Sequence, residues 1–171
     1  KFSEKGLLRD KKVFINPEAY SVLLPSQLAS ITENKKTVAR GSRIPLDLIT
    51  EDKEKNISRM FIHWTGKDQD LNGFFVNENL DKFKAAAYYE LRNNYARHSG
   101  DETYAHAPKG ASEFIDIDIN HALKDGMRYA MMDVRVFSGP SFLKHVQNFA
   151  GFMLRGNMDS GEIFEPSTVR G

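Results

Sequence analysis

One segment of this chain constrains its fold more than any other. Residues 113–119, Glu-Phe-Ile-Asp-Ile-Asp-Ile, alternate apolar and acidic side chains over most of their length. Successive side chains of a β-strand point to opposite faces, so this period of two predicts a strand with one buried face. The acidic face would then be solvated, with Asp116 and Asp118 about 7 Å apart on it.

Similar strand signals recur along the chain between Gly, Asn, Asp and Pro residues. They cover residues 59–64, 71–76, 85–91, 128–137, 149–154 and 162–164. The segment 85–91 is ambiguous, because its alanines favour helix and its tyrosines favour strand; the turn-rich segments on both sides favour strand. His121 to Gly126 predicts a short helical turn that ends at glycine. About seven short strands with little helix predict an all-β fold, an antiparallel β-sandwich with short helical turns.

The first part of the chain has a different character. Residues 1–41 mix short apolar pieces, such as 13–15, with turn residues and the polar run 32–36. We interpret residues 1–41 as a lead-in or an attached element of a larger protein. The sandwich domain is expected to span residues 42–171.

Composition narrows the possible functions. The 171 residues carry 24 Lys and Arg against 23 Asp and Glu, and the net charge of +1 gives no reason to expect a nucleic-acid partner. The absence of cysteine excludes disulfides and thiolate metal sites. No apolar run approaches the ~20 residues of a membrane span, and the N-terminus lacks the apolar stretch of a signal peptide. A cytoplasmic domain is the resulting expectation.

Two acidic segments are candidates for metal binding. The first, residues 66–73, is expected to be a loop between strands and offers the oxygens of Asp68, Asp70 and Asn72 at alternate positions. It matches the first half of an EF-hand loop, but position 12 is Asn79, and strands flank it, so we reject an EF-hand. A polar hairpin turn is the alternative.

The second acidic segment is the long loop predicted at residues 98–113. Asp101, Glu102 and Glu113 offer carboxylates from its two ends, and long loops inside compact domains often carry function. A solvated surface loop is the alternative. His98 and His106 are eight positions apart in this loop, which is not a recognised zinc spacing.

The order of these segments resembles the TerD family, the calcium-binding β-sandwich domains associated with tellurite resistance and the bacterial stress response. The resemblance covers residues 54–166 and rests on four pieces in order. They are Asp-Gln-Asp-Leu-Asn-Gly at 68–73, Tyr-Tyr-Glu-Leu-Arg-Asn-Asn leading to His-Ser-Gly-Asp at 88–101, Gly-Ala-Ser-Glu with the alternating strand at 110–117, and Ser-Phe-Leu followed by Phe-Ala-Gly-Phe-Met-Leu-Arg at 141–155.

Carried over residue by residue, the resemblance implies four calcium ligands and a further oxygen at Glu102. The four are Asp68, Asp70, Asp101 and Glu113. Two departures weaken the match, because Ala111 and Ser112 stand where the family has aspartates. The family domain also continues beyond the position of Pro166, so its last strands are expected to be missing here or to come from another chain or segment.

The function expected from these observations is that of a calcium-binding module rather than an enzyme. The ion would stiffen one end of the domain and present a surface to a protein partner or to further domains of the same protein. Two alternatives stay open. One is a metal-dependent hydrolase that uses the same acidic loops or the Asp116 and Asp118 pair. The other is a metal-free interaction scaffold with solvated acids.

Overall fold

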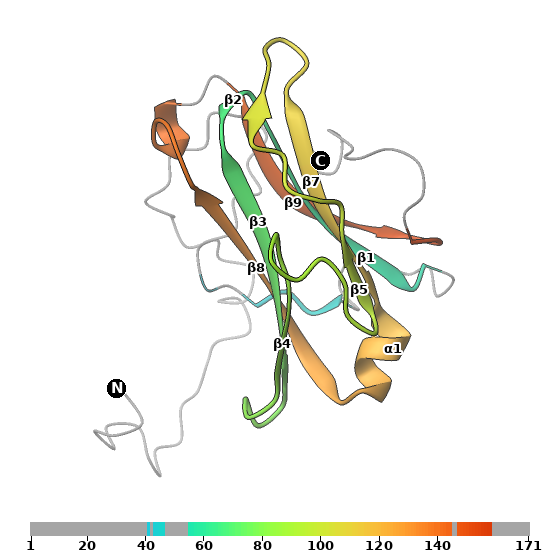
Figure 1. Ribbon diagram of the computed structural model, residues 1–171. Helices are drawn as coiled ribbons and strands as arrows, with labels where there is room; N and C mark the ends of the chain where they lie inside the picture. Colours follow the sequence, from blue (N-terminus) through green and yellow to red (C-terminus); the bar gives the residue numbers. More distant parts are fainter. Residues whose placement is uncertain (1–40, 42, 47–54, 145–146, 159–171) are drawn as a thin grey trace, which may run out of the picture. The chain divides into compact units, whose positions relative to one another are not determined.

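The computed structural model describes residues 41, 43–46, 55–144 and 147–158. The predicted lead-in at 1–41, apart from Gly41, and the predicted strand at 162–164 lie outside these residues. Within them the regular structure consists mostly of antiparallel strands, with one short α-helix (Figure 1). The prediction of an all-β fold is therefore confirmed, and the sandwich arrangement stays a prediction.

The larger sheet has four strands in the order β5-β7-β1-β9, all antiparallel. Its central strands are β1 (Ile57–Trp64) and β7 (Ala111–Asp118), with β5 (Ala96–His98) and β9 (Asn148–Arg155) at the edges. Every residue of β1 is buried. A strand buried on both faces reads as a continuous apolar run in sequence, and the Met-Phe-Ile-His-Trp segment of β1 has that character.

The second sheet has three strands, and β3 lies at its centre. It contains β4 (Phe83–Ala86), β3 (Gln69–Asn77) and β8 (Met127–Val136) in the order β4-β3-β8. A third pairing joins β2 (Gly66–Lys67) to β6 (Tyr104–Ala105), and the helices are α1 (Ile119–Lys124) and the 3₁₀ turn η3 (Phe142–Lys144). The β4 strand pairs only as far as Gly73, so the first part of β3 has β8 alone as a strand neighbour.

The predicted strand at 85–91 is only partly correct. The strand β4 ends at Ala86, and residues 88 and 89 form a tight turn closed by backbone hydrogen bonds between Ala87 and Glu90. The tyrosines of this turn are exposed rather than packed in a strand. The helical turn is confirmed: α1 begins after Asp118, whose carboxylate accepts the His121 N–H, and Gly126 follows with a φ of +84°.

Side chains from the two larger sheets form the hydrophobic core. Leu71 and Phe75 of β3 are buried with Ile115 and Ile117 of β7 in one cluster. The closest approach is at Gly73, where a Cβ would stand 3.0 Å from the Ile115 Cδ1 atom. Gly73 is therefore a packing residue inside a strand, not the turn glycine of an EF-hand-like loop.

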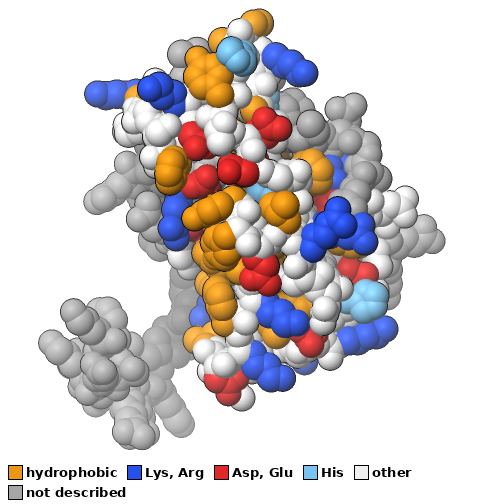
Figure 2. Space-filling view, in the orientation of Figure 1, with side chains coloured by type: hydrophobic (Ala, Val, Ile, Leu, Met, Phe, Trp, Pro, Cys, Tyr) orange, Lys and Arg blue, Asp and Glu red, His pale blue; other side chains and the backbone are white. Residues whose placement is uncertain are grey.

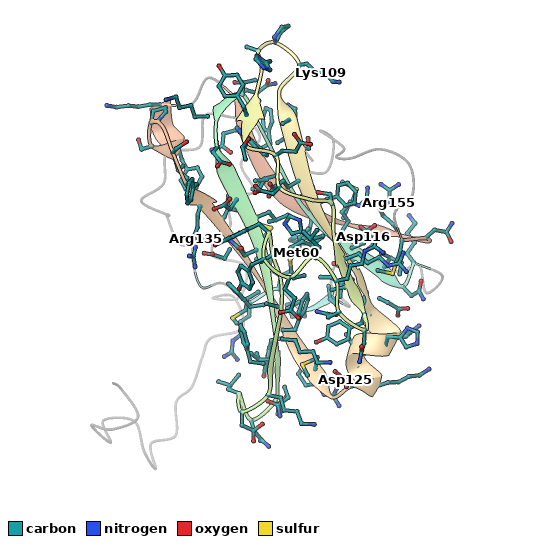
Figure 3. The ribbon with its side chains drawn as sticks, in the orientation of Figure 1. Met60, Lys109, Asp116, Asp125, Arg135 and Arg155 are labelled. Atoms are coloured by element: carbon teal, nitrogen blue, oxygen red, sulfur yellow. The ribbon has the colours of Figure 1, made fainter. Side chains whose placement is uncertain are left out.

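The prediction that Asp116 faces solvent is wrong. Asp116 is fully buried, and its two carboxylate oxygens accept hydrogen bonds from the Arg59 guanidinium at 2.5 and 2.6 Å. Arg59 stands directly opposite Asp116 in the β1–β7 register and lies over the Phe114 ring at 4.0 Å. Figure 3 shows Asp116 in the middle of the sheet, far from the loop that carries Lys109. The alternation of residues 113–119 therefore reports a strand with two buried faces.

None of the helices among the described residues combines the length and apolar character that crossing a bilayer requires.

Replacing Asp116 by Asn tests the role of this ion pair in stability. The substitution leaves a fully buried guanidinium without its negative partner, so the free energy of unfolding should fall by about 3–5 kcal/mol. Lys84→Met is the control, because the Lys84–Asp125 pair is 34% and 38% exposed and should contribute less than about 1 kcal/mol. Urea denaturation measures both, and equal losses would show that the buried pair has no special weight.

Candidate metal centre

Three carboxylates from two separate segments converge beside the start of β3. One oxygen each from Asp68, Asp70 and Asp101 lies within 4.8 Å of the other two. Asp68 and Asp70 are buried, whereas Asp101 is exposed. Such an arrangement brings like charges together in a region with restricted access to water, which costs free energy unless a cation offsets it.

The local fold at Asp70 differs from the predicted loop. The strand β3 begins at Gln69, so Asp70 and Asn72 are already strand residues, paired with Arg135 and Asp133 of β8. Alternate strand residues share a face, so Asp70 and Asn72 point away from the core that takes Leu71. The spacing that resembled a chelating loop is therefore the period of a strand with one polar face.

Asp68 is held in place by its backbone rather than by its side chain. Its carbonyl oxygen accepts the N–H groups of Phe137 and Ser138, at 3.1 and 3.3 Å, where β8 ends. Its Oδ1 atom is buried and has no hydrogen-bond partner among the described residues. A buried carboxylate oxygen without a donor is costly, and its position among two other carboxylates is the kind of environment that a metal ion relieves.

The electrostatics of the cluster raise the pKa of both buried acids. Burial is the main cause for Asp68, with repulsion from Asp70 and Asp101 adding to it. Burial also raises the pKa of Asp70, and Asp101 adds to this, while Arg135 on the facing strand opposes the shift. Both carboxyls therefore resist ionisation more than ordinary aspartates, and a bound cation would reverse that tendency.

Glu113 was expected to be a metal ligand, and the structure places it beside the cluster in a different role. Its Oε2 accepts the backbone N–H of Leu71 and its Oε1 accepts that of Glu102, both at 2.9 Å. Glu113 shares the inward face of β7 with Ile115, and only 1% of it is exposed. Its carboxylate therefore joins β3, between Asp70 and Asn72, to the loop that follows Asp101.

His98 also forms a hydrogen bond with the backbone of Leu71. Its Nδ1 accepts the Gly100 N–H at 3.1 Å, so its Nε2 carries the proton and donates to the Leu71 carbonyl at 2.9 Å. Both polar groups of the Leu71 backbone are thus bonded by side chains at a point that β4 does not reach. Burial lowers the pKa of His98, in keeping with a neutral ring, and neither ring nitrogen is left for a metal.

Glu102 contributes to the site through its backbone. Its N–H is bonded to Glu113, and its side chain is exposed and outside the group of three convergent carboxylates. Of the five residues expected to bind a metal, the structure thus brings together Asp68, Asp70 and Asp101, and it separates Glu102 and Glu113 from that group.

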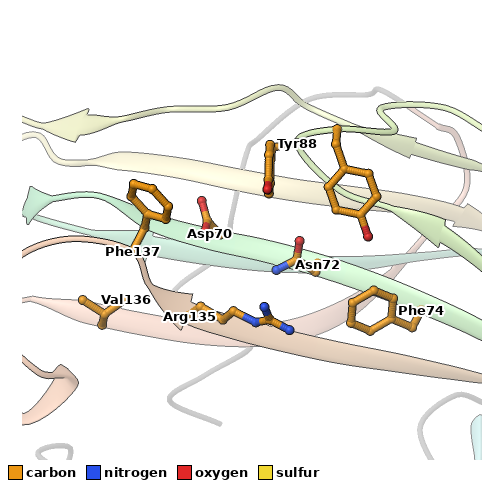
Figure 4. A pocket seen from close by; sticks show the side chains of 8 residues that line it. Asp70, Asn72, Phe74, Tyr88, Arg135, Val136 and Phe137 are labelled. Carbon is orange, nitrogen blue, oxygen red and sulfur yellow. The ribbon is translucent and has the colours of Figure 1, made fainter.

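Sequence reasoning missed Arg135 and the aromatic residues near the cluster. Arg135 lies opposite Asp70 in the β3–β8 register and donates its Nε–H to Asp133 at 2.6 Å. Tyr88 and Phe137 line a hollow that also includes Asp70 (Figure 4). No signal in the sequence pairs residues this far apart, because the register of two strands depends on their tertiary packing.

Comparison of the chain with models of protein families, with curated proteins and with solved structures finds no match.

A Glu113→Gln variant tests the raised pKa of Glu113. Burial raises the pKa of Glu113 to about 7 from an unfolded value near 4.5. Between those values the folded protein keeps a proton that the unfolded chain loses, so metal-free stability should fall by up to a few kcal/mol as the pH rises from about 4.5 to about 7. Glutamine cannot ionise, so this decline should shrink in the variant.

Urea denaturation in the presence of a chelator, repeated across this pH range, measures the effect. Glu90→Gln is the control, because Glu90 is exposed in the Tyr88–Tyr89 turn. An equal slope in the Glu113→Gln variant and the native chain would contradict the assignment.

Proposed function

We propose that this chain is a calcium-binding module related to the TerD family, in which one ion joins the start of β3 to the loop after β5. The observation that carries the proposal is the convergence of Asp68, Asp70 and Asp101 around a buried oxygen of Asp68 that has no hydrogen-bond partner among the described residues. The three residues are among those that the family resemblance assigns as ligands. The structure groups the same three carboxylates independently of the resemblance, and this supports both the metal site and the relation to the family.

The chemistry of the donors favours a hard cation. All three are carboxylates, the nearby His98 uses both ring nitrogens for backbone groups, and the chain has no cysteine. Calcium accepts six to eight oxygen ligands with flexible geometry, while magnesium requires a stricter octahedral arrangement and keeps more of its water. A cluster with one exposed member leaves room for water or another oxygen ligand, and this favours calcium.

The number of ions follows from residues 111 and 112. The family resemblance expects aspartates at these positions, where Ala111 pairs with Trp64 in the β1–β7 register and Ser112 bonds the His63 ring at 2.8 Å. Neither supplies a carboxylate. We therefore propose one calcium ion rather than two.

The proposed role of the ion is to cross-link segments that are distant in sequence. Asp68 and Asp70 flank the first residue of β3, and Asp101 lies beyond β4 and β5. A ligand present at 100 times its dissociation constant adds about 2.7 kcal/mol to stability. The ion would thus stiffen the loop at residues 99–103 and the surface around it, which suits a module that presents a calcium-dependent surface to a partner.

A metal-dependent hydrolase is the second candidate, because a hollow adjoins Asp70 as that hypothesis requires. Its other proposed carboxylates have structural roles. Asp116 is paired with Arg59, and Asp118 accepts hydrogen bonds from the backbone and ring of His121. No histidine is among the residues that line the hollow, and His98 is turned toward Leu71. The binding module is therefore the better supported function.

Asp68→Asn tests this proposal through two effects, of which the second separates it from a metal-free scaffold. Without metal, the variant should be more stable than the native chain, because it removes one of three repelling carboxylates. With calcium, the increase in melting temperature should be much smaller than in the native chain, because calcium affinity depends on ligand charge. Thermal unfolding in chelator, in calcium and in magnesium measures both.

Asp125→Asn serves as the matched control, since it removes one carboxylate at the end of α1 without touching the cluster. It should leave the calcium-dependent shift unchanged. If the native chain shows no calcium-dependent shift, or if Asp68→Asn retains the full shift, the proposed ligands are wrong.

A further inference from the structure

A groove on the outer face of β3 shares Asp70 with the proposed metal centre. Asp70, Asn72 and Phe74 stand at alternate positions of β3 and line it, and its volume is about 280 Å³. Figure 4 shows Arg135 rising beside them from β8. Ligand pockets in proteins have volumes of roughly 300 Å³ and more, so this groove suits a small ligand or one unit of a larger one.

Exposed aromatic rings border the groove. Tyr88, Tyr89 and Phe137 are 52%, 61% and 74% exposed, and they come from the turn after β4 and from the end of β8. Figure 2 shows acidic side chains gathered next to hydrophobic ones on this face. Aromatic side chains of this size are mostly buried in folded proteins, so three exposed rings around one hollow indicate a binding surface.

The polar groups of the groove provide both donors and acceptors. The Arg135 Nε and the Asn72 side-chain amide both donate to Oδ2 of Asp133, at 2.6 and 3.4 Å. These bonds fix the guanidinium beside Asp70, and its terminal N–H groups have no hydrogen-bond partner among the described residues. A ligand here meets guanidinium donors, carboxylate acceptors and aromatic faces within one small volume.

The charge of the site selects among ligands. The carboxylates of Asp68, Asp70, Asp101 and Asp133 against one guanidinium give a formal charge of −3, and one calcium ion reduces it to −1. A phosphate or carboxylate ligand would still meet net repulsion. Neutral hydroxyl groups add no charge, donate to carboxylates, accept from a guanidinium and can serve as calcium ligands.

We propose that the groove binds a saccharide in a calcium-dependent way, with adjacent hydroxyls at the ion beside Asp70 and the apolar face of the sugar ring on Tyr88 or Phe137. This inference rests on the proposed calcium site and assigns a ligand class to the open side of it. A saccharide combines a neutral set of paired hydroxyls with an apolar face, and the groove offers a partner for each. Arg135 and Asn72 would select which hydroxyls fit.

Three experiments on the full chain test this inference and keep its failure distinct from failure of the calcium site. Calorimetric titration with calcium alone tests the metal site. The calcium-loaded chain is then applied to a glycan array, and methyl glycosides of glucose, galactose, mannose and N-acetylglucosamine are examined by saturation-transfer NMR. Binding is expected in calcium and should disappear with a chelator.

Tyr88→Ala is expected to weaken saccharide binding at least tenfold while leaving the calcium titration unchanged. Tyr104→Ala is the matched control, because Tyr104 is also 52% exposed but does not line the groove. Normal calcium binding with no saccharide bound on the array or by NMR would overturn the saccharide assignment alone. Saccharide binding that persists in chelator, or equal losses in both tyrosine variants, would also overturn it, and absence of calcium binding would overturn both proposals.

Discussion

The carboxylate of Glu113 is the interaction on which the arrangement of this site depends. It accepts the N–H of Leu71 on β3 and the N–H of Glu102 in the following loop, and it extends from β7 of the other large sheet. Three separate segments therefore meet at one side chain. Because Leu71 lies between Asp70 and Asn72, the position of the acidic face of β3 relative to Asp101 follows from this bond. The Nε2–H of His98 holds the same residue by its carbonyl.

Three buried acids in this chain have different surroundings. Asp116 is paired with a guanidinium, and Glu113 accepts two backbone N–H groups. Asp68 has an oxygen with no protein donor among the described residues and lies next to Asp70 and Asp101. The first two are satisfied within the fold, whereas the described residues provide no hydrogen-bond donor for the third. That contrast, rather than the number of acidic residues, is the reason for proposing a cation at Asp68.

Much of the fold could be predicted from local patterns. The alternation of residues 113–119, the β-prone run before Trp64 and the glycine after α1 each correspond to an observed element. The errors have physical causes. The burial of Asp116 depends on Arg59 standing opposite it on another strand, and strand register cannot be read from either segment alone. In the predicted strand at 85–91, only Ala85 and Ala86 are strand residues, and Tyr88 and Tyr89 form a turn.

The candidate site was predictable in part. Asp68, Asp70 and Asp101 stood out because oxygen-bearing side chains recur in turn-like segments, and the structure brings them together. Glu113 carried the same chemical signal, yet its parity with Ile115 along β7 turns it toward Leu71 instead. Apart from Asp70 and Asn72, the groove residues gave no signal, since Arg135 is brought to Asp70 only by the pairing of β3 with β8.

The position of Glu113 also affects how genetic data on this protein would be understood. A screen of random substitutions that measures only metal binding would group Glu113 with Asp68 and Asp70. Loss of Glu113 would release the loop that carries Asp101 and so weaken binding indirectly. Its carboxylate oxygens, however, are already occupied by backbone N–H groups. Such scores would thus mark one acidic cluster in which Asp68, Asp70 and Asp101 would bind the proposed ion and Glu113 holds the backbone around them. Separate measurements of metal affinity and of folding stability are needed to distinguish the proposed ligands from Glu113.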